Sequence, residues 1–128
     1  MLISLGHVTV RSADFDRTER FYCGLLGMRP GPRPAIPVPG RWFYIGDVAV
    51  LHVLPAKVSS AHIGGSTVDH FALNAVDLPA YEQRLRAAGQ PFETVPLADS
   101  GIWQIFLIDP DGARVELCFE PGRPRDTR

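Results

Sequence analysis

The chain carries an internal repeat, and this duplication constrains its fold more than any other feature. Residues 7–27 read HVTVRSADFDRTERFYCGLLG, and residues 70–89 read HFALNAVDLPAYEQRLRAAG. In each segment a histidine opens an alternating apolar run, an aspartate follows seven positions later, and a helical pattern ends on glycine. Alternation predicts a strand, and aspartate and glycine favour the two ends of a helix. Each repeat is therefore expected to begin with a strand that leads into a helix.

The second half of each repeat predicts a hairpin. Residues 41–55 (RWFYIGDVAVLHVLP) contain two apolar runs around a Gly-Asp turn, and residues 103–121 (WQIFLIDPDGARVELCFEP) contain two around Asp-Pro-Asp-Gly. Turn residues between alternating runs are typical of β-hairpins. Each repeat of about sixty residues thus predicts a strand, a helix and two or three further strands, and the two repeats are expected to share a core.

The repeats also predict how the chain is organised. We expect a single domain with a first unit at about residues 1–56, a joining loop at about 57–66, a second unit at about 67–121 and a flexible tail at 122–128. The joining segment is small, polar and rich in glycine. Residues 29–40 (RPGPRPAIPVPG) are rich in proline and predict an ordered, irregular loop beside a pocket.

Four polar residues occupy apolar strands at positions that the repeat makes equivalent. His7 and His70 are 63 positions apart, and Glu116 follows His52 by 64. Each unit therefore offers one group from its first strand and one from its last, and we expect all four on one concave face. Two imidazoles and a carboxylate form a facial ligand set that suits divalent iron, zinc, manganese or nickel. The sequence thus predicts a metal site in which His52 is a fourth ligand, a general base or a substrate contact.

Other side chains on the same face are candidates for substrate contact. They are Thr9, Arg11, Trp42 and Tyr44 in the first unit and Gln104 and Phe106 in the second. For the three aromatic residues, a place in the pocket wall or core is as well supported as a specific contact with substrate. A buried amide such as that of Gln104 needs hydrogen-bond partners, which a ligand can supply.

Three more residues are considered for the site. Arg114 and Cys118 share a face with Glu116, and Cys118 is expected to be a small buried hydrophobe rather than a nucleophile. His62 lies in the joining loop, where a surface position is expected and a part in a lid is the alternative.

Composition limits the partners of the chain. Its 128 residues are 45% hydrophobic and 21% charged with a net charge of −1, which supplies no field for nucleic acid. The two cysteines form neither a C-x-x-C pair nor a disulfide framework, which fits a reducing cytoplasm. The first strand is expected to begin almost at Met1, so no leader is expected, and no apolar run is long enough to predict a membrane span.

These motifs resemble those of the vicinal oxygen chelate superfamily, which includes glyoxalase I, extradiol ring-cleaving dioxygenases, fosfomycin-resistance thiol transferases and bleomycin-resistance proteins. The matching stretches are GHVTV, FYCGLLGM, DHFAL and FLIDPDGARVEL, and they extend over residues 3–120. The resemblance implies an α+β fold in which two βαβββ units form a cupped, mixed eight-stranded sheet with the helices outside. It also implies a homodimer, with the metal site completed within one chain or across two.

The resemblance carries the family's metal ligands onto His7, His70 and Glu116. Glyoxalase I usually has a glutamate where this chain has His52, and most ring-cleaving dioxygenases are far longer. The fosfomycin enzymes share the size, the ligand triad and the threonine at position 9, but their potassium-binding serine loop has no clear counterpart in PLADSGIWQ.

The function implied is that of a small metal-dependent enzyme that binds neighbouring oxygens of a small substrate. Its chemistry is expected to be that of a glyoxalase-like isomerase or lyase, or of a dioxygenase, with His52 and Glu116 as catalytic residues. One alternative is a fosfomycin-type thiol transferase. Another is a bleomycin-resistance-like binder that holds a planar aromatic compound between Trp42, Tyr44 and Phe106.

Overall fold

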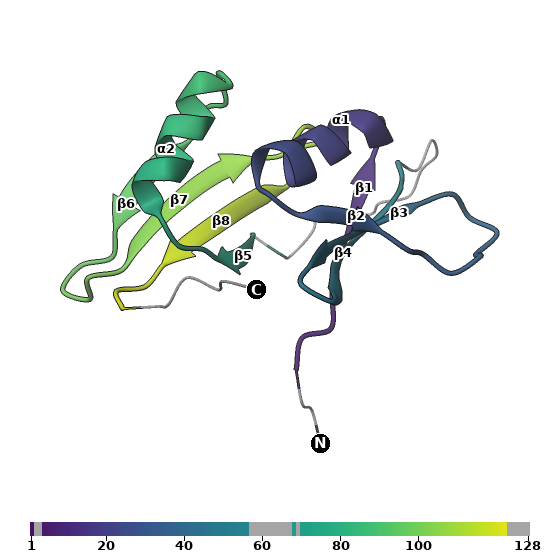
Figure 1. Cartoon of the computed structure of the whole chain (residues 1–128), viewed down its shortest axis with the longest axis horizontal. Coiled ribbons are helices and arrows are strands. Elements are labelled where there is room, and N and C mark those ends of the chain that lie inside the picture. The colour runs from purple at the N-terminus through teal and green to yellow at the C-terminus, as the bar shows by residue number, and fades with distance from the viewer. Residues whose placement is uncertain (2–3, 57–67, 69, 123–128) are drawn as a thin grey trace. The chain divides into compact units, whose positions relative to one another are not determined.

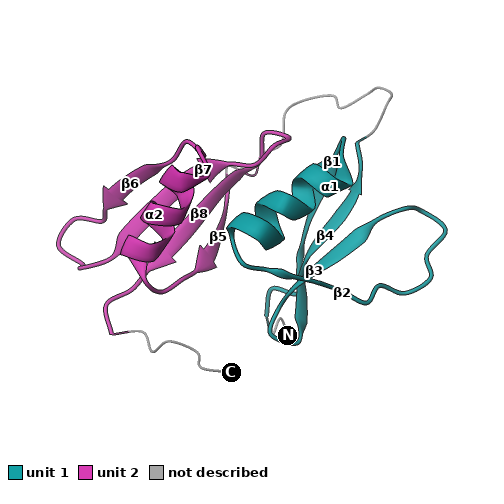
Figure 2. Cartoon of the chain, turned by 45° about the horizontal axis from the view of Figure 1, so that its top comes forward, with its two compact units in different colours: residues 1–62 teal, residues 63–128 magenta. Residues whose placement is uncertain are grey.

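Each repeat of the sequence folds as a unit of its own in the computed structural model (Figures 1 and 2). The units are Met1–His62 and Ile63–Arg128. The structure describes residues 1, 4–56, 68 and 70–122. The expected joining loop at about 57–66, with His62, lies outside the described residues, as does the tail beyond residue 122.

Unit 1 is a four-stranded mixed sheet with one irregular helix. Its elements are β1 (Val8–Ser12), α1 (Phe15–Glu19), the π-helical η1 (Arg20–Leu25), β2 (Arg29–Gly31), β3 (Arg41–Ile45) and β4 (Val48–Pro55). The strand order is β1-β4-β3-β2, in which β1 pairs parallel to β4 and the other pairs are antiparallel.

Unit 2 repeats this plan. Its elements are β5 (Phe71–Asn74), α2 (Leu78–Ala87), β6 (Glu93–Pro96), β7 (Trp103–Ile108) and β8 (Arg114–Phe119). The order β5-β8-β7-β6 has the same parallel and antiparallel pairs at equivalent places. The expected α+β class built from two βαβββ units is confirmed, and the eight strands are hydrogen-bonded as two sheets of four.

The helix ends that the sequence predicts are confirmed. Asp14 caps α1 by accepting a hydrogen bond from the Arg17 amide at 3.1 Å, and Asp77 caps α2 by accepting one from the Ala80 amide at 3.2 Å. Gly89 follows α2 at φ 66°, where glycine relieves the strain of the left-handed conformation. Among the described helices, none is long and apolar enough to span a membrane.

The first helix is less regular than its sequence pattern indicates. After one α-helical turn it continues as η1, whose wider turn ends with a hydrogen bond from the Leu26 amide to the Phe21 carbonyl at 3.0 Å. Two consecutive residues, Phe21 and Tyr22, are both buried in this turn. Gly27 then ends the helix at φ 91°, as its position in the sequence predicts.

In each unit one face of the sheet is covered by the helix. Tyr22 packs against Phe43 in unit 1, and Tyr81 of α2 packs edge-on against Phe119 of β8 in unit 2. The apolar side chains of these faces are buried; they include Val10, Leu51, Val53, Ile105, Leu107, Val115 and Leu117. Because side chains alternate along a strand, their neighbours in sequence occupy the opposite face, where the candidate residues lie.

Two predictions about the strands need correction. His7 and His70, expected inside strands, each lie one residue before a strand, because the parallel ladders begin at Val8 and at Phe71. The first strand begins at Val8 rather than almost at Met1, and Leu5 ahead of it is 83% exposed. The two histidines keep equivalent positions in the two units.

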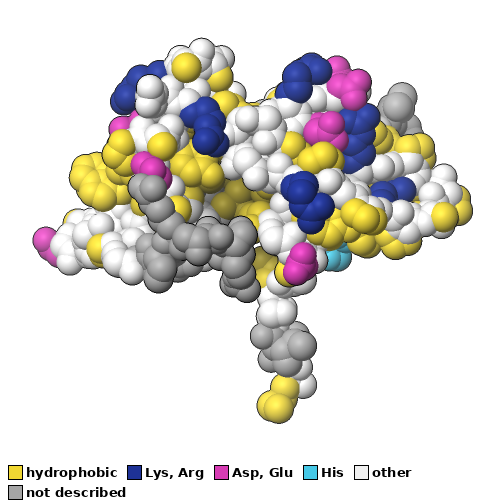
Figure 3. Space-filling view, viewed as in Figure 1, with side chains coloured by type: hydrophobic (Ala, Val, Ile, Leu, Met, Phe, Trp, Pro, Cys, Tyr) yellow, Lys and Arg dark blue, Asp and Glu magenta, His cyan; other side chains and the backbone are white. Residues whose placement is uncertain are grey.

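Charged side chains of both signs are interspersed on the face seen in Figure 3. This distribution agrees with the net charge of −1. Neither charge sign dominates this face, so it carries no strong field of one sign.

Candidate metal-binding residues

Glu116 is the central residue of the candidate site in unit 2. It lies in the middle of β8, opposite Phe106 of β7 and Ala72 of β5, on the face that α2 does not cover. Only 9% of its side chain is exposed. A carboxylate with so little access to water needs partners for its oxygens.

Both oxygens of Glu116 have partners. His70 donates from Nε2 to Oε2 over 2.9 Å, and Gln104 donates from Nε2 to Oε1 over 2.7 Å. Gln104 reaches the carboxylate from the neighbouring antiparallel strand β7. The amide of Gln104, which the sequence predicts as a substrate contact, thus orients the carboxylate of Glu116.

Phe106 connects this cluster to a guanidinium. Its ring lies edge-on to that of His70, with centroids 5.7 Å apart and an angle of 89° between the planes. On the ring of Phe106 lies the guanidinium of Arg114, whose central carbon is 4.4 Å from the ring centroid. This cation–π contact fixes Arg114 beside the candidate ligands, a role that the strand alternation alone did not indicate.

In unit 1, His52 is covered on both sides by aromatic rings. The His7 ring stacks on it with centroids 3.8 Å apart and 12° between planes, and Trp42 stacks with 4.1 Å and 10°. Trp42 is the direct cross-strand partner of His52, and Thr9 is its partner on the other side. Burial lowers the pKa of the His52 imidazole, and the neighbouring His7 lowers it further.

The other predicted substrate contacts of unit 1 have partners within the unit. Arg11 is exposed and donates to the Pro55 carbonyl at 3.1 Å. Tyr44 donates its hydroxyl to the carbonyl of Pro32 and carries the Arg29 guanidinium over its ring at 5.3 Å. Tyr44 therefore anchors the proline-rich segment to β3.

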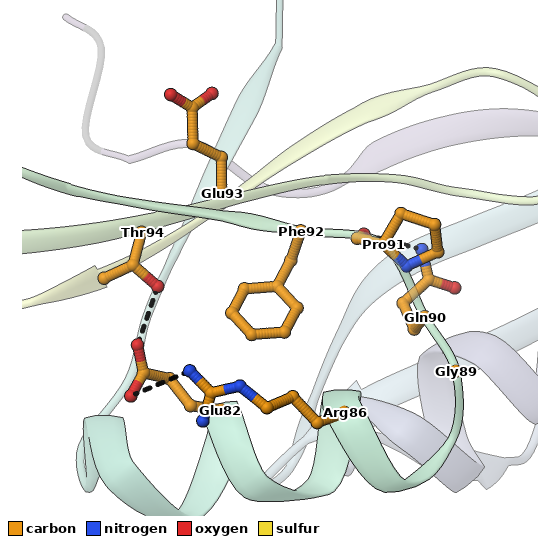
Figure 4. A pocket seen from close by; sticks show the side chains of 8 residues that line it. All are labelled: Glu82, Arg86, Gly89, Gln90, Pro91, Phe92, Glu93 and Thr94. Carbon is orange, nitrogen blue, oxygen red and sulfur yellow. Dashed lines mark hydrogen bonds and ion pairs between the residues drawn. The ribbon is translucent and has the colours of Figure 1, made fainter.

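Unit 2 has a hollow of about 610 Å³ between α2 and β6 (Figure 4). Three of its polar side chains bind one another. Thr94 donates to Glu82 at 2.8 Å, Arg86 pairs with Glu82 at 3.9 Å, and Arg86 lies over the Phe92 ring. These contacts tie the helix to the edge strand, and Glu93 points away from them in Figure 4.

A second hollow of about 510 Å³ includes residues of β7 and β8 in its lining. It is lined by Gln90, Pro91, Phe92, Glu93, Phe106, Leu107, Ile108 and Arg114. Phe106 belongs both to this lining and to the edge-on contact with His70. Phe106 and Arg114 thus link the lining of this hollow to the cluster around His70.

The donor atoms of unit 2 fit a metal ion. Two ligands bound side by side at about 2.1 Å lie about 3 Å apart, and His70 Nε2 and Glu116 Oε2 are 2.9 Å apart. Imidazole nitrogen with carboxylate oxygen is a donor set for zinc, iron, manganese or nickel. Each unit brings together two of the four candidates, His7 with His52 and His70 with Glu116. Among the described residues, no group of three or more His, Cys, Asp or Glu side chains is placed to hold a metal.

Comparisons with known proteins agree with this fold. The chain is 28% identical to the protein named glyoxylase I 4 of Arabidopsis thaliana over 124 residues, 91% of this chain and 71% of that protein. A glyoxalase family protein from Bacillus anthracis superimposes with a TM-score of 0.76 at 20% identity, covering 94% of this chain and 97% of that one.

Two further structures have the same fold. The lactoylglutathione lyase of Agrobacterium tumefaciens gives a TM-score of 0.68 at 20% identity, covering 91% of this chain and 92% of its own. The fosfomycin resistance protein FosX of Listeria monocytogenes gives 0.74 at 18% identity, covering 95% and 97%. Residues 4–117 match the family described as the Glyoxalase/Bleomycin resistance protein/Dioxygenase superfamily, and the chain belongs to that superfamily.

Proposed function

We propose that the chain is a metal-dependent, glyoxalase-like isomerase in which His7, His70 and Glu116 bind one divalent ion. The observation that carries the proposal is that His70 Nε2 lies 2.9 Å from Oε2 of Glu116, whose carboxylate is nearly buried. Membership of the superfamily and the 28% identity to a protein named for glyoxalase I support it.

The hydrogen bonds that orient Glu116 support the proposal. Gln104 holds one oxygen of Glu116, which leaves the other directed at His70. Such hydrogen bonds to a ligand fix its orientation and raise its affinity for metal. When bound, a divalent ion would supply Lewis acidity that holds two neighbouring oxygens of a substrate and stabilises a negative charge developing on them.

The substrate class that we propose is the hemithioacetal of a 2-oxoaldehyde, as the name of the lactoylglutathione lyase relative suggests. Isomerisation moves a proton from one carbon to its neighbour, and His52 is the group that we assign to this transfer. No atom is gained or lost in this step, so no second reactant is needed. Thr9 and Arg11, near His52, are proposed to contact the substrate.

The remaining proposed contacts belong to the aromatic walls. Trp42 and Tyr44 offer ring surfaces in unit 1, and Phe106 with Arg114 borders the 510 Å³ hollow in unit 2. A guanidinium beside a hollow favours a substrate with an anionic group. We further propose a small-molecule substrate and a homodimeric enzyme.

The proposal is tested with methylglyoxal pre-equilibrated with glutathione. The protein is stripped with a chelator and reloaded with zinc, nickel, manganese or ferrous iron, and formation of the thioester is followed. Turnover that requires metal and is abolished in Glu116→Gln supports the proposal, while Asp47→Asn in an exposed turn serves as the control. Ring cleavage of a catechol with oxygen uptake, or binding of an aromatic ligand that survives chelation without turnover, would overturn it.

A further inference from the structure

We infer that His52 is not a metal ligand and that, besides the proton transfer proposed above, it positions His7: stacked between Trp42 and His7, it orients the His7 ring. The inference rests on the proposed function, because it concerns the ligands of the same ion. Of the roles that the sequence leaves open for His52, it excludes that of a fourth metal ligand.

The ring geometry is the first argument. A metal binds an imidazole in the plane of the ring, along the lone pair of a nitrogen. The planes of His7 and His52 are 12° apart with centroids at 3.8 Å, so the nitrogen lone pairs of the two rings lie in separate, nearly parallel planes and one ion cannot lie in both. For both rings to bind one ion, the stack must open.

The second argument is the contrast with unit 2. There the ring of His70 stands at 89° to Phe106, and its Nε2 converges with Glu116 Oε2 at 2.9 Å. Convergence of donors is what a metal site requires, and unit 2 has it where the stacked pair of unit 1 does not.

The third argument distinguishes the two stacked histidines. His52 is half-buried and has Trp42 on one face and His7 on the other, which restricts rotation of its ring. His7 is exposed, lies just before β1, and is equivalent to His70 in the repeat. Of the two, His7 is therefore the one that can present a nitrogen to an ion.

The stack depends on an irregularity in the hairpin. Next to the turn, Ile45 pairs with Val48, whereas Trp42 pairs with His52, and the register shifts between Phe43 and Ile45. Without this shift Trp42 would face Leu51, whose side chain is in the core. The bulge thus places Trp42 where it supports His52, which in turn supports His7.

The test uses Co²⁺ as the probe, with its visible absorption and its affinity as readouts. His52→Phe keeps a flat ring in the stack and removes both nitrogens, whereas His52→Ala removes the ring. We expect His52→Phe to bind Co²⁺ within about threefold of the wild type with an unchanged spectrum, and His52→Ala to bind about tenfold more weakly. His7→Phe, the matched variant in the same stack, is expected to lose at least about 100-fold and to change the spectrum.

Folding is checked independently through Trp42. The chain has two tryptophans, so Trp103→Phe leaves Trp42 as the reporter of the stack. Its emission should stay close to that of the parent in His52→Phe and shift to the red in His52→Ala, where the indole loses its cover.

Each outcome bears on a different claim. A His52→Phe protein that stacks normally but loses Co²⁺ or changes its spectrum makes His52 a ligand and overturns the inference alone. Equal affinities of the Phe and Ala variants overturn the positioning role. A wild-type protein that binds no Co²⁺ overturns the proposed function and the inference with it.

Discussion

Removing the amide of Gln104 should destabilise the protein even without metal. Gln104 donates to Oε1 of Glu116 over 2.7 Å, and the carboxylate side chain is only 9% exposed. In Gln104→Leu a side chain of similar volume replaces the amide, so that Oε1 loses its partner and gains little water in return. The substitution therefore isolates the hydrogen bond more than the packing.

The size of the effect follows from the charge of the acceptor. A hydrogen bond to a charged group contributes about 1.5–3 kcal/mol, and an unsatisfied buried acceptor costs about 1–3 kcal/mol. We expect the free energy of unfolding of the metal-free protein to fall by about 2 kcal/mol in Gln104→Leu, measured by urea denaturation. Gln83→Leu makes the same change on the exposed side of α2 and should alter stability by less than about 0.5 kcal/mol.

A double-mutant cycle separates this hydrogen bond from other effects. With Glu116→Leu as the second substitution, the coupling energy should be about 1.5–3 kcal/mol. A coupling below about 0.5 kcal/mol, or equal losses in Gln104→Leu and Gln83→Leu, would refute the conclusion that Gln104 supports the Glu116 carboxylate.

Three further predictions concern the fold around the site. Asp109 is 4% exposed and accepts two backbone N–H hydrogen bonds within its turn, at 2.8 and 2.9 Å. Asp109→Ala should therefore lower the free energy of unfolding, measured in urea, by about 1–3 kcal/mol. An equal loss in Asp111→Ala, at an exposed position, would contradict this reasoning. Burial raises the pKa of the Cys23 thiol from 9.0 to about 11. In a Cys118→Ser background, iodoacetamide at pH 8 should therefore react about 100-fold more slowly with the folded protein than with the protein unfolded in urea. Similar rates would show that the thiol is not shielded. A Cβ added at Gly24 meets no atom within 4 Å. Gly24→Ala should therefore raise the free energy of unfolding, followed by thermal denaturation, by about 0.5–1 kcal/mol. A decrease would mean that η1 does not tolerate the side chain.

The repeat made much of the fold predictable from sequence. Apolar alternation and the turn residues located both hairpins, and Asp14, Asp77, Gly27 and Gly89 located the helix ends. These signals are local, because each depends on the conformation of a few consecutive residues. The equivalence of the two histidines also held, since it follows from the repeat rather than from the strand limits.

The details of the site were less predictable, because they depend on pairing between strands. The sequence places Trp42 on the same face as His52, but their direct pairing depends on the register shift between Phe43 and Ile45, which has no signal in the sequence. The bond from Gln104 to Glu116 depends on the diagonal reach of one side chain between neighbouring strands, which alternation does not specify. The π-helical turn at η1 likewise has no simple signal in its sequence.

The most direct test of the central claim is the metal content of the purified protein. Wild-type, His70→Ala and Asp47→Asn proteins are stripped, incubated with zinc, nickel, manganese and ferrous iron in turn, freed of unbound ion and analysed for their elements. The account predicts about one equivalent of metal in the wild type and in Asp47→Asn, and close to none in His70→Ala. A wild type that retains no metal from any of these ions, or a His70→Ala protein that retains as much as the wild type, would contradict it.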